Sequence, residues 1–175
     1  MKKKLTKIIP ILISCMIGFG VITFGWIIQD VQLKGITVRS ATGGVALQVR
    51  GLTDTNYTNE VAFSDNIALL PCIKVDAQLQ DENGTDVSCN PDYVKEISMF
   101  VKPSEKAKLY ATVEVDGGLP IKIDCNNIDV TGTTEVMAIN AKDTRLDFRI
   151  WIDGETYTEA GTANITITLH AEKYQ

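Results

Sequence analysis

Single-residue alternation of apolar and polar side chains after about residue 44 constrains the fold more than any other feature. Successive side chains of a β-strand point to opposite faces, so each alternating stretch would bury one face and expose the other. The stretches are Val45/Leu47/Val49, Ile73/Val75/Ala77/Leu79, Leu109/Ala111/Val113/Val115, Ile121/Ile123, Leu146/Phe148/Ile150/Ile152 and Ile165/Ile167/Leu169. Half-buried strands of this kind are typical of antiparallel sheets.

Turn signals separate these stretches, and no long segment outside the N-terminal block has helical spacing. The signals are Gly43-Gly44, Asn83-Gly84, Asp116-Gly117-Gly118, Asp153-Gly154 and Ala160-Gly161. Several short strands divided by such turns indicate two packed sheets. We therefore expect residues 26–175 to form a single all-β domain, an antiparallel β-sandwich of the jelly-roll or immunoglobulin-like kind.

The N-terminal block has a different character. Four lysines at positions 2, 3, 4 and 7 precede an uncharged apolar run over residues 8–28. A basic start before an apolar run is read by the secretion machinery, and this run is also long enough to cross a bilayer as one helix. Small residues at Thr23 and Gly25 allow cleavage between Gly25 and Trp26, with Gly18-Phe19-Gly20 as a second candidate. Both a cleaved signal peptide over residues 1–25 and a retained membrane anchor over residues 8–28 stay open.

In either case the folded part is expected outside the cytoplasm, because the lysines remain on the cytoplasmic side. The whole chain has 17 basic and 22 acidic residues; without residues 1–25 it keeps 13 basic side chains, a net charge of −9. Nucleic acid binding needs a basic stripe, so we expect no nucleic-acid partner. An acidic surface suits a secreted or cell-surface domain.

The segment after the apolar run is expected to be a strand that seeks a partner. Its apolar residues do not share one parity because Gly35 interrupts the phase, which predicts a bulge or kink there. After cleavage, an apolar end would lead the strand, and it could fill a groove in a neighbouring molecule. The residues predicted for this polymerising strand are Trp26, Ile27, Ile28, Val31, Leu33, Ile36 and Val38.

The residues needed for common catalytic sites are missing. His170 is the single histidine, on the outward parity of the last alternating stretch, and it is interpreted as a surface residue. One histidine cannot supply a His-Glu-x-x-His zinc motif, and neither a nucleophile elbow nor a glycine-rich phosphate loop occurs. The sequence thus predicts a protein that is not an enzyme and carries no cofactor.

Oxygen-bearing side chains crowd the segment from Asp81 to Asp86, as they do in calcium loops. Asp81, Asn83 and Asp86 are therefore weak candidates for calcium ligands. The spacing lacks the downstream glutamate of an EF-hand, and Asn83-Gly84 is itself a strong hairpin signal. We expect a plain turn here and no metal site.

Three cysteines follow the N-terminal block. Cys125 shares the inward parity of Ile121 and Ile123 and is expected to be a buried thiol. Cys72 and Cys89 flank the predicted turn and are the natural pair for a disulfide. A regular hairpin centred on Asn83-Gly84 would instead hold them about 20 Å apart, so the pairing requires an irregular loop and stays open.

Trp151 lies on the outward parity of the stretch that contains Phe148, Ile150 and Ile152. An exposed tryptophan can be a ligand platform or a subunit contact. The alternative, which we favour, is that Trp151 is covered by another part of the same domain, because tryptophan is seldom left bare.

Three segments of the chain resemble one known family: the lysine-led segment through Gly18-Phe19-Gly20 to Trp26, the strand Gly35-Ile36-Thr37-Val38 and the stretch from Phe148 to Gly154. That family is the camelysin/TasA-like group of Gram-positive surface and biofilm-fibre proteins. The alternating strand Ile165–Leu169 is similar to the C-terminal strand of that group. The resemblance implies an exported jelly-roll domain that is displayed at the surface or polymerised by strand exchange. The sequence offers no ligand set for the metallopeptidase activity attributed to part of the family.

Two functions therefore remain as hypotheses. The first is a non-enzymatic fibre subunit of the cell surface or biofilm matrix that self-associates through its N-terminal strand. The second is a monomeric adhesion or accessory module held at the membrane by residues 8–28.

Overall fold

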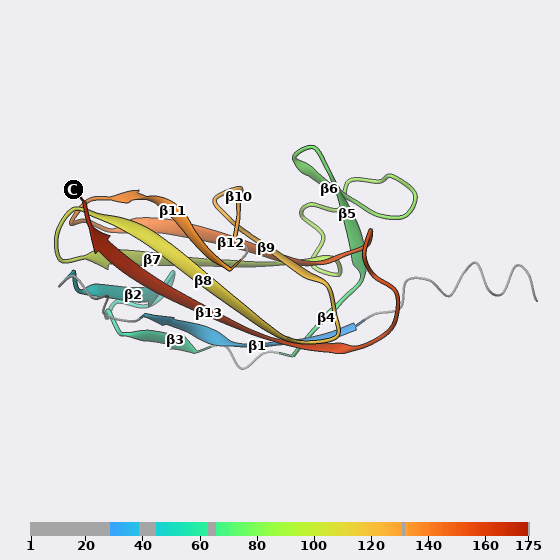
Figure 1. Ribbon diagram of the computed structural model, residues 1–175, viewed down its shortest axis with the longest axis horizontal. Helices are drawn as coiled ribbons and strands as arrows, with labels where there is room; N and C mark the ends of the chain where they lie inside the picture. The colour runs from blue at the N-terminus through green and yellow to red at the C-terminus, as the bar shows by residue number, and fades with distance from the viewer. Residues whose placement is uncertain (1–28, 39–44, 63–65, 131, 175) are drawn as a thin grey trace, which may run out of the picture.

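The computed structural model describes residues 29–38, 45–62, 66–130 and 132–174, and this part of the chain folds into two β-sheets (Figure 1). Its strands are β1 (Gln29–Val38), β2 (Leu47–Gly51), β3 (Glu60–Ala62), β4 (Asn66–Leu69), β5 (Pro71–Val75), β6 (Gln78–Gln80), β7 (Val94–Pro103), β8 (Ala107–Gly117), β9 (Ile121–Cys125), β10 (Ile128–Asp129), β11 (Thr133–Ile139), β12 (Thr144–Asp153) and β13 (Thr162–Lys173). None of the described residues belongs to a helix that is long and apolar enough to cross a bilayer.

The first sheet, called sheet A, has the order β11-β8-β13-β1, and both β3 and β4 lie along the far side of β1. β4 pairs with the N-terminal half of β1 and β3 with its C-terminal half, both antiparallel. β13 pairs antiparallel with β8 over its whole length but parallel with β1. β1 is thus an interior strand of sheet A.

The second sheet, called sheet B, has β12 at its centre. β12 pairs antiparallel with β9 on one side and β7 on the other; β10 extends the sheet beyond β9, and β2 beyond β7. β5 pairs parallel with the last residues of β12 and carries β6 at its other edge. β5, β6 and the loop that follows form the upper right part of the molecule in Figure 1.

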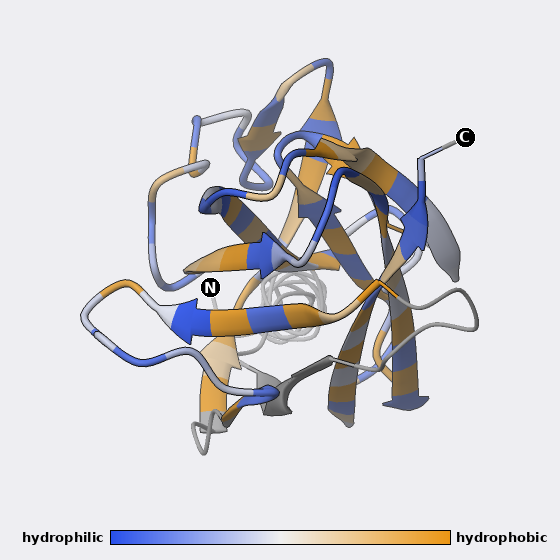
Figure 2. Ribbon diagram, turned by 90° about the vertical axis from the view of Figure 1, so that its left-hand side faces the viewer, coloured by the Kyte–Doolittle hydropathy of each residue, from blue (hydrophilic) through white to orange (hydrophobic). Residues whose placement is uncertain are grey.

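The core lies between the two sheets and is made of the inward side chains of their strands. Hydrophobic and hydrophilic residues alternate along these strands as bands in Figure 2. The predicted inward residues of β12 and β13 are all fully buried: Leu146, Phe148, Ile150, Ile152, Ile165, Ile167 and Leu169. Each contributes about 1.5–3 kcal/mol by leaving water. For the described residues, the predictions of an all-β fold, two sheets and these buried faces are confirmed.

The prediction of one strand from Ile73 to Leu79 is wrong. Asp76 has a φ of 55°, and the chain turns there to form the β5–β6 hairpin. Val75 is consequently 44% exposed, whereas Leu79 is buried on β6. Alternation continues across the turn in the sequence, so the pattern alone could not reveal it.

The prediction of a purely antiparallel sandwich is also wrong, because β1 with β13 and β5 with β12 are parallel pairs. On β8, burial ends earlier than expected: Leu109 and Ala111 are buried, but Val115 is 40% exposed. β7 was not among the predicted strands, although Ile97, Met99 and Val101 alternate and are buried.

The bulge predicted at Gly35 is confirmed, since the register of β1 against β13 shifts between Leu33 and Gly35. The predicted cleavage position at Gly25 and Trp26, the apolar run over residues 8–28 and the leading residues Trp26, Ile27 and Ile28 of the proposed strand lie outside the described residues.

Candidate functional site

The most distinctive feature of the fold is the place that β1 occupies in sheet A, which we call the β1 slot. β1 is hydrogen-bonded to β13 on one side and to β3 and β4 on the other. Eight residue pairs join it to β13, from Asp30 with Thr162 to Val38 with Leu169. β1 and β13 run side by side along the length of the molecule in Figure 1.

The inward-facing side chains of β1 and its flanking strands that the structure describes are apolar and buried. Val31 on β1 is fully buried, and so is its partner Ala163 on β13. Leu69 on β4 and Ile165 on β13 are also fully buried in the same core. The slot can therefore hold an extended segment through its main chain while burying the apolar side chains that point inward.

A second feature is a polar depression of about 410 Å³ on the outer face of sheet B. Its polar lining residues come from β7, β9, β12 and the β9–β10 turn: Glu96, Ser98, Asp124, Asn126, Asn127, Arg145, Asp147 and Arg149. Asp124 and Arg149 are opposite each other on β9 and β12, so sheet pairing itself places the two charges together.

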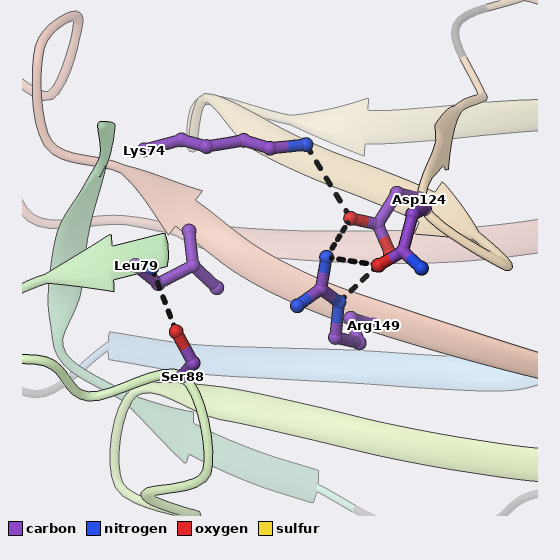
Figure 3. Close-up of polar contacts among 6 residues, drawn as sticks. Lys74, Leu79, Ser88, Asp124 and Arg149 are labelled. Atoms are coloured by element: carbon purple, nitrogen blue, oxygen red, sulfur yellow. Dashed lines mark hydrogen bonds and ion pairs between the residues drawn. The ribbon is translucent and has the colours of Figure 1, made fainter. Parts of the chain in front are cut away.

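Asp124 is fully buried and accepts hydrogen bonds from two cations (Figure 3). Arg149 Nε lies 3.0 Å from Oδ1 and Arg149 Nη2 lies 2.5 Å from Oδ2, a bidentate pair. Lys74 Nζ lies 3.5 Å from Oδ2 and also sits 5.3 Å from the ring centre of Trp151. Hydrogen bonding to Asp124 raises the pKa of Arg149, so this guanidinium stays charged.

Asp147 forms a second, more exposed network beside the first. Its Oδ1 accepts hydrogen bonds from Ser98 Oγ at 2.5 Å and from Arg145 Nε at 2.8 Å. Partial burial of Asp147 acts to raise its pKa, but the bonds from Ser98 and Arg145 outweigh burial and lower the pKa below the usual value. A carboxylate that acts as a general base near neutral pH needs the opposite shift.

The chemistry available in the depression is therefore that of a satisfied polar network. Its two central carboxylates are bonded to cations, and none of the described residues that line it is a histidine or cysteine. Nowhere in the described part of the chain do three or more histidine, cysteine or acidic side chains gather as a potential metal site. We assign the network to holding β7, β9 and β12 together.

Trp151 is covered by its own domain, as favoured from the sequence, and the interpretation as an exposed platform is wrong. It is 2% exposed and packs with Cys72, Leu79 and Val94 in a small cluster outside the main core. β6 and the loop that follows it, which we call the covering loop, supply Leu79 and Val87 to this cluster. Leu79 N–H donates a hydrogen bond to Ser88 Oγ at 2.8 Å, which joins β6 to this loop (Figure 3).

The predicted turn around Asn83 is present, with Gly84 at a φ of 77°. The Asp81 carboxylate accepts hydrogen bonds from the main-chain N–H groups of Asn83 at 2.9 Å and Thr85 at 2.8 Å. Asp86 accepts one from Ser88 N–H at 2.9 Å. These bonds lower the pKa of both carboxyl groups, the Thr85 bond being the largest cause for Asp81. The proposed calcium candidates thus serve the turn.

Cys72 and Cys89 are both free thiols, so the disulfide considered from the sequence is not formed in this structure. Cys72 is buried on β5, whereas Cys89 is exposed in the covering loop. Cys125 is buried as predicted. Burial raises the pKa of Cys72 and of Cys125 to about 12.

His170 has a half-buried ring that stacks on Tyr110, with ring centres 5.0 Å apart and nearly parallel planes. Its imidazole lies 3.8 Å from a Glu172 carboxylate oxygen. The stacking of His170 on Tyr110 is a cross-strand contact between β13 and β8 on the outer face of sheet A. It makes His170 a packing residue rather than an isolated surface group.

Sequence reasoning missed the walls of the β1 slot and the pair Asp124–Arg149. The only signal for the pair was opposite charge on the outward parity of two predicted strands. Comparison of the sequence with protein-family models and with curated proteins finds no match.

Proposed function

We propose that the protein is a non-enzymatic, extracytoplasmic structural subunit that assembles into a cell-surface or biofilm-matrix fibre by exchanging β1 between chains. One observation carries the proposal: β1 is inserted parallel to the last strand, β13, in the interior of sheet A. The same slot can accept the β1 strand of a neighbouring chain, with identical register and identical contacts.

The strand order supports a jelly roll into which β1 has been added. Without β1, sheet A has the order β3/β4, β13, β8 and β11, and four neighbouring strands of sheet B have the order β7, β12, β9 and β10, with β2, β5 and β6 as additions to them. This is the order of the two sheets of an eight-stranded jelly roll, with β3/β4 as its first strand. In such a fold the first and last strands are antiparallel neighbours; here they flank β1, which is antiparallel to one and parallel to the other.

The position of β1 in the sequence suits exchange. If the chain is cleaved after Gly25, only Trp26, Ile27 and Ile28 precede the strand. β1 can then leave its slot without threading through another element. Because the bonds broken in one molecule re-form in the next, the balance between monomer and fibre depends mainly on protein concentration.

The location and the fibre role rest on the basic and apolar N-terminus and on the resemblance to camelysin/TasA-like proteins. The finding that the polar depression is internally satisfied supports a non-enzymatic role. Both are consistent with a domain that acts through its own strands.

The test locks β1 in its own slot. Val31 and Ala163 are paired and fully buried, so the double variant Val31→Cys/Ala163→Cys can be cross-linked within one chain. The exported protein should form fibres visible by electron microscopy, and the cross-linked variant should stay monomeric by light scattering. The reduced double variant is the matched control and should assemble. Assembly that survives the cross-link would contradict the proposal.

A second candidate function is a membrane-held monomer that serves as an adhesion or accessory module. The observation that favours it is that the chain fills its own slot, so the domain is complete without a neighbour. Mass spectrometry of the native N-terminus separates the two: an intact Met1 supports the anchored module, and a start at Trp26 supports the fibre subunit.

A further inference from the structure

The edge of sheet A is covered by β11 along only half of β8. The β11–β8 ladder ends at Thr133 with Thr112, and the last bond on this side is from Val113 N–H to the Gly132 carbonyl, at 3.0 Å. Before that point the chain belongs to sheet B, since Val130 N–H donates to the Ile123 carbonyl at 2.9 Å. Among the described residues, the second half of β8 therefore has β13 on one side and no strand on the other, which we call the open edge.

Along this open half of β8, alternate residues direct their main-chain N–H and C=O groups away from β13, in the plane of the sheet. Val113 N–H is directed away from β13, and residues two apart in a strand direct their N–H and C=O groups to the same side. The N–H and C=O groups of Val115 thus face the open edge. Among the residues that the structure describes, none pairs with Val115 on that side.

A crevice of about 200 Å³ lies beside this edge, in the seam between the two sheets. Its apolar walls are Val113, Val115, Ile121, Ile123 and Val130, and Lys122 of β9 borders it on the sheet B side. Val115 is 40% exposed. A strand added to the edge of β8 would bury every second side chain against these walls.

The charges on the edge select which strand fits. Glu114 and Asp116 are exposed and alternate with the valines, so they flank the outward side chains of an added strand. Opposite charges in cross-strand positions are favourable, and like charges are not. A second copy of the same edge, paired antiparallel about Val115, would set Glu114 opposite Asp116. The two acids therefore act against self-pairing, as charged residues do at many sheet edges.

We propose that the β8 edge, Val113–Gly117, is a docking site for an extended strand of a partner protein in which apolar residues alternate with lysine or arginine. The strand pairs with the main chain of Val115, places its apolar side chains in the crevice and lays its basic side chains beside Glu114 and Asp116. The site is distinct from the β1 slot, so it does not depend on strand exchange.

The test uses the full chain in detergent micelles and a dye-labelled heptapeptide of alternating lysine and valine, followed by fluorescence anisotropy. We expect saturable binding below about 1 mM. The same peptide with N-methylated valines keeps its charge but loses its hydrogen-bond donors, and it should not bind. Binding of the N-methylated peptide with equal affinity would overturn the proposal, and so would an absence of binding by the parent peptide.

The variant Glu114→Lys/Asp116→Lys tests the charge rule. It should weaken binding of the lysine–valine peptide roughly three- to tenfold and should bind a glutamate–valine peptide instead. Glu82→Lys/Asp92→Lys makes the same change in net charge at other exposed positions and should leave the peptide affinity within about twofold. Equal effects of the two variants would overturn the site. A dimer of the unmodified chain by sedimentation, abolished by Val115→Pro, which removes an N–H group that faces the edge, would assign the edge to a second copy and would also overturn the proposal.

Discussion

Arg149 binds both carboxylate oxygens of Asp124, which is completely buried although it lies on the outer face of sheet B (Figure 3). Replacing Arg149 with methionine keeps most of the side-chain volume but leaves Lys74, at 3.5 Å, as the remaining cation. Breaking a buried pair from one side strands a charge, so Arg149→Met should lower the free energy of unfolding by about 3 kcal/mol. Urea denaturation followed by circular dichroism measures the loss.

Arg145 provides the control on the same strand. It pairs with Asp147, but both side chains are about half exposed, at 55% and 48%. Exposed pairs contribute between 0 and about 1 kcal/mol, so Arg145→Met should cost little. Equal losses for Arg145→Met and Arg149→Met would show that the burial of Asp124 has no energetic consequence.

The pH dependence of stability should include a contribution from Asp147. Its pKa is lowered in the folded state, so its stabilising effect is complete above the unfolded pKa of about 3.9 and is lost as the pH falls through the lower folded value. The variant Asp147→Asn should make the decline of the melting temperature between about pH 4 and pH 2 shallower. If the melting temperature falls by the same amount with pH in the variant and in the unmodified protein across this range, the assignment is contradicted.

The three thiols of the β-domain should differ sharply in reactivity. Cys72 and Cys125 are buried with a pKa of about 12, and thiolate is the reactive form, so both should be inert to a thiol reagent at pH 8. Cys89 is exposed and should react fast. Labelling of the folded, unmodified protein should show one rapid phase, and the variant Cys89→Ser should lack this phase.

The same experiment tests the disulfide that the sequence left open. If Cys72 and Cys89 pair in the exported protein, Cys89 will label only after reduction. Rapid labelling without a reductant supports the free thiols of the structure.

Gly117 should be required for β8 to pass close to β13. It has a φ of 137°, and a Cβ atom there would overlap the carbonyl oxygen of Thr162. Gly117→Ala should therefore cost at least about 2 kcal/mol of unfolding free energy. Its neighbour Gly118 has no atom within 4 Å of a Cβ position, so Gly118→Ala should change stability by less than about 0.5 kcal/mol. A smaller loss for Gly117→Ala than for Gly118→Ala would refute this account of the strand end.

The sequence was sufficient to predict burial in strands that place one face on the core and the other in solvent, because their alternation reports both faces. Phe148, Ile150 and Ile152 face the core, and their parity alone predicts this correctly. The outward parity of Trp151 was also correct, but its exposure depends on Cys72, Leu79, Val87 and Val94, which pack around it. Local alternation says which face a residue takes and does not say whether another segment covers that face.

The candidate site could be predicted only in part. The bulge at Gly35 is visible because a glycine interrupts the phase within one strand. The neighbour of β1 is not visible, because Val31 and Ala163 are far apart in the sequence and parallel pairing leaves no turn signal between them. The hairpin at Asp76 was missed for a related reason: Asp76-Ala77 carries no glycine or proline, and the alternation runs through it unchanged.

The most direct test of strand exchange mixes two forms of the exported protein that carry different affinity tags. One form has Val31→Cys and the other has Ala163→Cys, and both carry Cys89→Ser to remove the exposed native thiol. A disulfide between differently tagged chains then reports that β1 of one chain lies beside β13 of another. Strand exchange predicts a cross-linked species that contains both tags and increases with protein concentration. If oxidation leaves the two forms unlinked at every concentration, while the double variant cross-links fully within its own chain, β1 never leaves its slot and the central claim is wrong.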